Sequence, residues 1–219
     1  MQKNSPVLKQ CLLFSGIEEQ NLEALLGCLG ARPQRYGKGE AILREGDPAN
    51  HLGIVLVGSV QVVREDYYGN RSIMAKLGPT DMFAEAFACA DVPAIPVSVI
   101  ALEATEALLI DAHRITCPCQ NACSFHSQLI NNMIRILATK NLLCNRKIEV
   151  TSKRSTREKL MTYLMLRAKE TNSNSFSIPF DRQELADYLE VDRSGLSSEI
   201  SKLRKEGVLT SEKNQFTLL

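Results

Sequence analysis

The stretch that decides the fold is Asp181–Gly207, DRQELADYLEVDRSGLSSEISKLRKEG. Its apolar residues recur at helical spacing, which predicts two short helices at Arg182–Leu189 and Arg193–Lys205. Asp181, within a capping box, and Asp192 stand where a carboxylate can accept hydrogen bonds from the first turn of each helix. Two capped helices joined by a short break are typical of a helix-turn-helix.

The second of these helices begins with one arginine among short polar side chains. The residues expected to contact base edges in a major groove are Arg193, Ser194, Ser197 and Ser198. Basic residues around the motif are candidate phosphate contacts, namely Lys153, Arg154, Arg157, Lys159, Lys202, Arg204, Lys205 and Lys213. The alternative is a small helical domain that binds another protein instead of DNA.

The residues that flank the motif complete a small domain. An amphipathic helix is expected over 155–169, followed by a short strand at Phe176–Phe180. After the motif, Gly207–Thr210 and Phe216–Leu218 are expected to form a β wing.

The region from Arg35 to Ile110 has a different pattern, in which short β-rich runs alternate with glycine turns. About seven or eight strands at a spacing of roughly 8–12 residues indicate a sandwich or barrel. This region therefore predicts a separate β domain, which precedes the helix-turn-helix.

Between the two regions, Ser124–Val150 contains no Gly and no Pro, which predicts one helix about 40 Å long. One apolar stripe has coiled-coil spacing and consists of Ile130, Ile134, Leu137, Asn141, Cys144 and Ile148. A second stripe beside it consists of Leu129, Met133, Ile136 and Leu143. We expect one stripe to pack on the β domain and the other on the same helix of a second subunit. The alternative is a helix buried within one chain.

Composition excludes several classes of protein. The chain has 219 residues, with 26 Lys plus Arg, 25 Asp plus Glu and a net charge of +1, so it has neither an acidic tail nor a basic coat. Its apolar runs are too short to cross a bilayer, and Met1–Pro6 does not begin a signal peptide. We therefore expect a cytoplasmic protein with no membrane partner. Catalysis is not expected, because the three histidines are scattered and hydrolase or phosphate-loop motifs are missing.

The seven cysteines include a cluster, Cys117, Cys119 and Cys123, that is followed by His126. A reducing cytosol disfavours disulfides. If Cys119, Cys123 and His126 begin a helix, they share one face and are candidate zinc ligands. The alternatives are thiols that sense oxidants near a helix N-terminus and thiols that only pack.

With its parts in this order, the chain resembles the cyclic-AMP receptor protein/fumarate-nitrate regulator (CRP/FNR) family of bacterial transcription factors. The matching motifs are Gly39–Asp47, Val57–Val62, Leu77–Glu85, Arg182–Ala186 and Asp192–Ser194. The resemblance implies an α+β fold: an N-terminal β-barrel or jelly roll of the cyclic-nucleotide-binding type, a long dimerisation helix and a C-terminal winged helix-turn-helix. We place these parts at residues 1–123, where an effector is sensed, at 124–152, and at 153–219, where DNA is bound.

The resemblance also implies partners and site residues. A homodimer would bind double-stranded DNA at a palindromic operator, and RNA polymerase is a further candidate partner. Arg193, Ser194 and Ser198 fall where the family contacts bases, while Arg182 and Gln183 fall where it meets the DNA backbone.

One departure from the family bears on the effector. Cyclic-nucleotide binders carry an Arg-Ser pair ten residues after the Glu that matches Glu85, and Ile95 and Pro96 stand there in this chain. A cyclic phosphate needs a cation or clustered N–H donors. Neither Ile nor Pro carries a charge, and Pro also lacks a backbone N–H. We therefore expect that the effector is not cyclic AMP but an unknown small hydrophobic or aromatic molecule.

The residues expected to contact this effector are Glu85, Ile95, Pro96 and Cys144. Three alternatives stay open: a packed pocket without a ligand, a cysteine-based redox or zinc input with the same DNA-binding output, and an interaction module that does not bind DNA.

Overall fold

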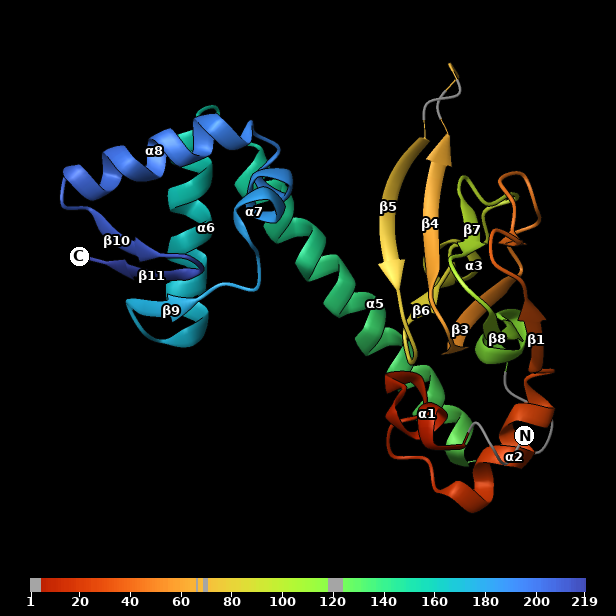
Figure 1. Cartoon of the computed structure of the whole chain (residues 1–219). Helices are drawn as coiled ribbons and strands as arrows, with labels where there is room; N and C mark the ends of the chain where they lie inside the picture. The colour runs from red at the N-terminus through yellow and green to blue at the C-terminus, as the bar shows by residue number, and fades with distance from the viewer. Residues whose placement is uncertain (1–4, 66, 69–70, 118–123) are drawn as a thin grey trace. The chain divides into compact units, whose positions relative to one another are not determined.

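The computed structural model describes residues 5–65, 67–68, 71–117 and 124–219 (Figure 1). The chain forms two compact units, Met1–Ala138 and Thr139–Leu219, called here the N-terminal and C-terminal units. The boundary falls inside one helix, α5 (Ser124–Thr151), which confirms the long helix predicted from the absence of Gly and Pro. Among the described residues, no helix is both long and apolar enough to span a bilayer.

The N-terminal unit is built on two antiparallel four-stranded sheets, with strand orders β1-β8-β3-β6 and β2-β7-β4-β5 (Figure 1). This confirms the predicted β domain. The strands are β1 (Arg32–Tyr36), β2 (Ala41–Leu43), β3 (His51–Val57), β4 (Val60–Glu65), β5 (Arg71–Leu77), β6 (Met82–Phe83), β7 (Ser98–Ala101) and β8 (Thr105–Asp111).

Short helices pack against the sheet β1-β8-β3-β6 of this unit. They are α1 (Ser5–Gln10), the 3-10 turn η2 (Leu12–Phe14), α2 (Glu19–Cys28), α3 (Glu85–Cys89) and α4 (His113–Thr116). The start of α5 joins their core through Leu129, Met133 and Ile136. Asn132 is also buried there, and its Nδ2 donates to the Leu13 carbonyl at 2.9 Å and to the Ser15 carbonyl at 2.8 Å. Apolar packing and this polar contact together hold α5 against the N-terminal segment.

The stripe with coiled-coil spacing is exposed over most of its length, although its Ile130 and Leu137 are half-buried. Ile134 and Ile148 are 58% and 62% exposed, and Asn141 and Cys144 are exposed between them. Leu143, which the sequence grouped with the buried stripe, is 55% exposed, because it lies in the C-terminal unit beyond the helices that cover Leu129.

The C-terminal unit is a winged helix-turn-helix. Its elements are α6 (Thr156–Thr171), β9 (Ser175–Ser177), α7 (Arg182–Leu189), α8 (Arg193–Lys205), β10 (Leu209–Glu212) and β11 (Gln215–Leu218). The three strands form an antiparallel sheet in the order β10-β11-β9, so β9 supports the predicted wing. The bounds of α7 and α8 agree with those predicted from the two aspartate caps.

A glycine fixes the contact between β3 and β6. Gly53 pairs with Phe83 across the two strands, and a methyl group on Gly53 would lie 1.9 Å from Cζ of the Phe83 ring. Phe83 is 2% exposed and belongs to the core between the sheets. Only a residue without Cβ lets this ring come so close to the strand.

We expect Gly53→Ala to lower the free energy of unfolding by about 1–3 kcal/mol, because the buried ring has to leave its position. Urea unfolding of the full chain measures the change. Gly27→Ala is the matched control, since a methyl group on Gly27, within α2, meets no atom within 4 Å and alanine favours a helix. Equal stability of wild type and Gly53→Ala would contradict this account of the contact.

Candidate nucleic-acid interface

Local hydrogen bonds set where α7 begins and ends. Asp181 Oδ1 accepts from the backbone N–H of Glu184 at 2.8 Å, and Glu184 Oε2 accepts from the N–H of Asp181 at 2.7 Å. The helix ends at Glu190, whose left-handed backbone (φ +55°) lets the chain turn toward α8. Lys159, from α6, donates to the carbonyls of Leu189 (3.2 Å) and Glu190 (3.3 Å), so it stabilises this turn.

The packing of α8 determines which of its side chains face solvent. Leu196, Ile200 and Leu203 are buried in the core of the C-terminal unit. Arg193 and Ser194 are therefore exposed at the start of the helix, and Ser198 is exposed one turn later. Ser197, the fourth residue predicted to contact bases, is only half-exposed, and its carbonyl accepts from the Ser201 hydroxyl at 2.9 Å.

The two residues predicted to meet the DNA backbone differ in their surroundings. Arg182 is half-buried, donates to the Lys213 carbonyl at 3.0 Å and stacks over the Phe216 ring at 5.3 Å. Burial, and secondarily the charge of Arg204, lowers the pKa of Arg182. The position of Arg182 thus joins α7 to the wing. Gln183 is exposed, and its amide donates to Asp187 Oδ1 at 2.8 Å.

Two of the expected phosphate contacts are engaged inside the unit. Arg157 pairs with Glu206 through both terminal nitrogens and lies 3.6 Å from Glu199, and Lys159 holds the turn after α7. The sequence could not reveal this, because their partners are 30 to 49 residues away along the chain.

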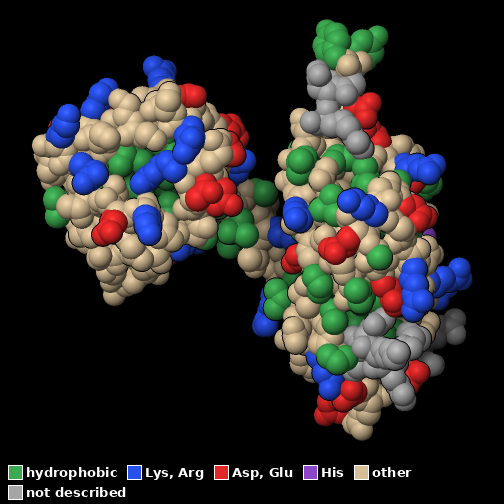
Figure 2. Space-filling view, in the orientation of Figure 1, with side chains coloured by type: hydrophobic (Ala, Val, Ile, Leu, Met, Phe, Trp, Pro, Cys, Tyr) green, Lys and Arg blue, Asp and Glu red, His purple; other side chains and the backbone are tan. Residues whose placement is uncertain are grey.

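Other basic side chains of the C-terminal unit remain available to a ligand. Within the described residues, Arg193, Arg204, Lys205 and Lys213 have exposed side chains without a hydrogen bond or ion pair. Lys202 lies 3.8 Å from Glu199 at the edge of this set. Basic side chains predominate over acidic ones on the face of this unit seen in Figure 2.

The residues predicted to contact an effector are spread over both units. Glu85 (4% exposed) begins α3, Ile95 (1% exposed) packs in the core between the sheets, and Pro96 is exposed. The backbone of Ile95 is engaged as well, since its N–H donates to the Asp47 carbonyl and its own carbonyl accepts from Gly46, both at 2.9 Å. Cys144 is exposed in the C-terminal unit.

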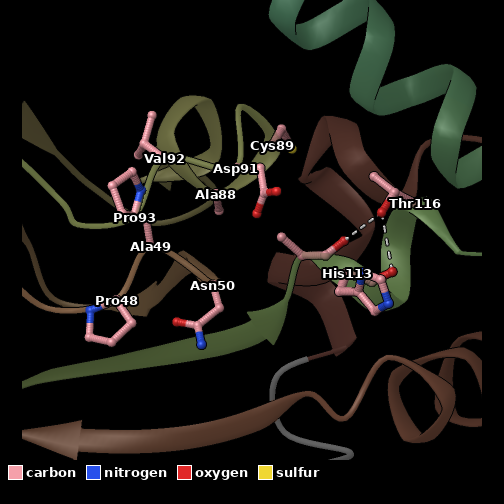
Figure 3. A pocket seen from close by; sticks show the side chains of 11 residues that line it. Pro48, Ala49, Asn50, Ala88, Cys89, Asp91, Val92, Pro93, His113 and Thr116 are labelled. Carbon is pink, nitrogen blue, oxygen red and sulfur yellow. Dashed lines mark hydrogen bonds between the residues drawn. The ribbon is translucent and has the colours of Figure 1, made fainter.

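A pocket of about 390 Å³ lies beside α3 in the N-terminal unit (Figure 3). Asp91, Val92 and Pro93, which follow α3, supply part of its wall, and polar groups from Asn50, His113 and Thr116 supply another part. Its lining consists of Pro48, Ala49, Asn50, Ala88, Cys89, Asp91, Val92, Pro93, Ala112, His113 and Thr116. Glu85, Ile95 and Pro96 do not line it.

The predicted zinc ligands are only partly covered by the structure, because Cys119 and Cys123 lie outside the described residues. His126 is 3% exposed, and its Nε2 lies 3.0 Å from the Ile115 carbonyl. Because a carbonyl only accepts, Nε2 carries the proton, and Nδ1 has no hydrogen-bond partner in the described part of the chain. Cys117 is exposed, with its Sγ 3.5 Å from Nε2 of His113. The zinc site stays a prediction.

Comparison with known proteins supports both units. The family described as "Cyclic nucleotide-binding domain" matches residues 33–117, and the one described as "Crp-like helix-turn-helix domain" matches residues 158–219. These are the two regions that the sequence separated and that the structure folds into a sheet pair and a winged helix-turn-helix.

Individual relatives agree with this assignment. A CRP-like cAMP-activated global transcriptional regulator of Mycobacterium tuberculosis is 30% identical over 36% of this chain, a match that spans 34% of that relative's length. The transcriptional activator protein FnrA of Stutzerimonas stutzeri is 23% identical over 95% of this chain and 84% of its own. The structure of the c-di-GMP-responsive regulator CLP of Xanthomonas campestris has a TM-score of 0.53 at 21% identity, and covers 92% of this chain and 99% of that one.

The order of a cyclic-nucleotide-binding-type domain and a helix-turn-helix defines a class of DNA-binding transcription regulators rather than enzymes. The chain belongs to the CRP/FNR family of these regulators, which confirms the resemblance seen in the sequence.

The acidic caps of the C-terminal unit make its stability depend on pH. Hydrogen bonds from the backbone and hydroxyl of Ser155 hold the pKa of Glu158 below its ordinary value of 4.5. A depressed folded-state pKa stabilises the protein above the ordinary value, and this contribution is lost as the pH falls through the folded-state pKa.

We therefore expect Glu158→Gln to lower the thermal midpoint of the full chain at pH 7, and the difference from wild type to shrink as the pH falls below about 4.5. Glutamine keeps the capping box and removes only the charge. Differential scanning calorimetry at a series of pH values measures the midpoint, and Glu212→Gln, at an exposed position of β10, is the control. A difference that persists unchanged at pH 3 would contradict the assignment.

Proposed function

We propose that this protein is an effector-responsive, sequence-specific DNA-binding regulator that acts as a homodimer in the cytoplasm, where its DNA target lies. The observation that carries the proposal is the exposed start of α8, where Arg193, Ser194 and Ser198 stand free of the core. Unpaired cations on the same helix, Arg204 and Lys205, supply attraction to phosphates. Base contacts and phosphate contacts are the two things that a specific DNA-binding helix needs.

The exposed stripe of α5 supports the homodimer. Ile134 and Ile148 recur with coiled-coil spacing and leave an apolar seam in water, and a second copy of α5 is the partner with a matching seam. Asn141, in this seam, would fix the register of the pair. Two helix-turn-helices related by twofold symmetry suit a palindromic operator whose half-sites lie about 34–36 Å apart, with RNA polymerase as a further partner.

The input is proposed to be a small molecule other than cyclic AMP. The side chain of Ile95 packs in the core, and Pro96 has no N–H, so neither offers a donor to a cyclic phosphate. The pocket beside α3, with polar groups from Asn50, Asp91 and His113, is a candidate site for the effector. The alternative inputs are oxidation of Cys117, which contacts His113, and zinc held by Cys119, Cys123 and His126. A protein-binding module without DNA contact is the alternative output.

We expect Arg193→Ala to weaken binding to a cognate duplex about fivefold to a hundredfold, because a well-placed arginine–guanine contact carries this much discrimination. The duplex is first recovered from a randomised library with the wild-type full chain, and affinity is then measured by fluorescence anisotropy. Lys169→Ala is the matched control, since it removes the same charge from the end of α6 that leads to β9. Failure of the wild type to retain any duplex at low salt would contradict DNA binding itself.

Titration of cyclic AMP into the full chain is expected to give no saturable heat at micromolar concentrations, because Ile95 and Pro96 provide no cation for the phosphate. Isothermal calorimetry measures this, and the cAMP-activated mycobacterial relative is the positive control. Saturable binding by this chain would overturn the proposed effector class.

A further inference from the structure

The cap of α8 engages the hydroxyl of a residue that faces DNA in the proposed function. Asp192 precedes the helix, and its Oδ2 accepts from the backbone N–H of Gly195 at 2.9 Å. The same oxygen accepts a hydrogen bond from the hydroxyl of Ser194. One carboxylate oxygen therefore caps the helix and orients the Ser194 side chain.

This contact fixes the hydrogen-bonding character of Ser194. A serine hydroxyl has one donor and two lone pairs. Because its only hydrogen points to Asp192, the exposed Ser194 Oγ offers only lone pairs to an incoming ligand. Hydrogen bonds from Ser194 and Gly195 also hold the pKa of Asp192 below its ordinary value of 3.8, so the carboxylate is charged and remains an acceptor at neutral pH.

The neighbouring side chains differ in this respect. Arg193 has only donors, and among the described residues the hydroxyl of Ser198 has no hydrogen-bond partner, so it can donate or accept. The exposed start of α8 thus combines a donor at 193, an acceptor at 194 and an adaptable group at 198.

In a major groove, the base atoms that donate hydrogen bonds are the exocyclic amines, adenine N6 and cytosine N4, whereas guanine O6 and N7 and thymine O4 only accept. We propose that Ser194 determines part of the operator sequence by accepting a hydrogen bond from one such amine, and that Asp192 is the positioning residue that makes Ser194 an acceptor. This inference rests on the proposed DNA-binding function.

The test uses the full chain and a duplex selected from a randomised library by the wild type. At each half-site position, adenine is replaced by purine or cytosine by 2-pyrimidinone, which removes the amine alone. 7-Deaza-purines, which remove the N7 acceptor alone, are the matched base control. Affinities come from fluorescence anisotropy with wild type, Ser194→Ala, Ser194→Thr and Ser198→Ala.

We expect one position at which loss of the amine weakens wild-type binding about two- to tenfold, the range of a single net hydrogen bond. The same loss should have no effect on Ser194→Ala, while Ser194→Thr, which keeps the hydroxyl, and Ser198→Ala should respond like wild type. The inference is overturned if Ser194→Ala responds to every amine replacement as wild type does, or if its response differs only with 7-deaza-purines, which would make Ser194 a donor.

Asp192→Gly tests the positioning role separately. Glycine is also tolerated at the N-cap, so α8 keeps its start while the acceptor for the Ser194 hydroxyl is lost. In this variant, loss of the amine should weaken binding less than it does in wild type, while the thermal midpoint stays near that of wild type. If loss of the amine weakens binding as much as in wild type, Asp192 has no part in the proposal. Absence of any retained duplex with the wild type would instead contradict the DNA-binding function on which the proposal rests.

Discussion

The burial of one face of α8 is the constraint on which the candidate interface depends. Leu196, Ile200 and Leu203 pack against α6 and α7, and this single apolar stripe fixes the rotation of the helix about its own axis. Rotating the helix away from this orientation would bring these apolar side chains into water, at a cost of roughly 1.5–3 kcal/mol for each large side chain. Side chains that face a ligand are thus positioned by side chains that never touch it.

Much of this arrangement could be predicted from the sequence because its signals are local. Asp181 and Asp192 cap their helices through residues only three positions away, so the bounds of α7 and α8 follow from the chain itself. The length of α5 follows equally directly, from a run without Gly or Pro. The order of the β domain and the helix-turn-helix, together with the motifs matched within them, then indicated the family.

What the sequence could not predict depends on contacts between distant residues. Arg157 and Lys159 are residue types that often contact phosphates. In this structure, however, Glu206 pairs with Arg157, and the carbonyls of Leu189 and Glu190 accept hydrogen bonds from Lys159. The pocket beside α3 combines residues from three separated segments, and its polar members Asn50 and His113 lie far in sequence from α3. The role of Gly53 likewise depends on a ring that belongs to another strand.

The internal engagement of Arg157 and Lys159 has a consequence for how the protein responds to its surroundings. When a protein binds DNA, each phosphate that it neutralises releases condensed counterions, and the steepness of the salt dependence follows their number. Basic side chains that are already engaged within the fold do not neutralise phosphates, so they release no counterions. The affinity of the proposed DNA complex should therefore vary less with ionic strength than the number of basic residues in the C-terminal unit would suggest.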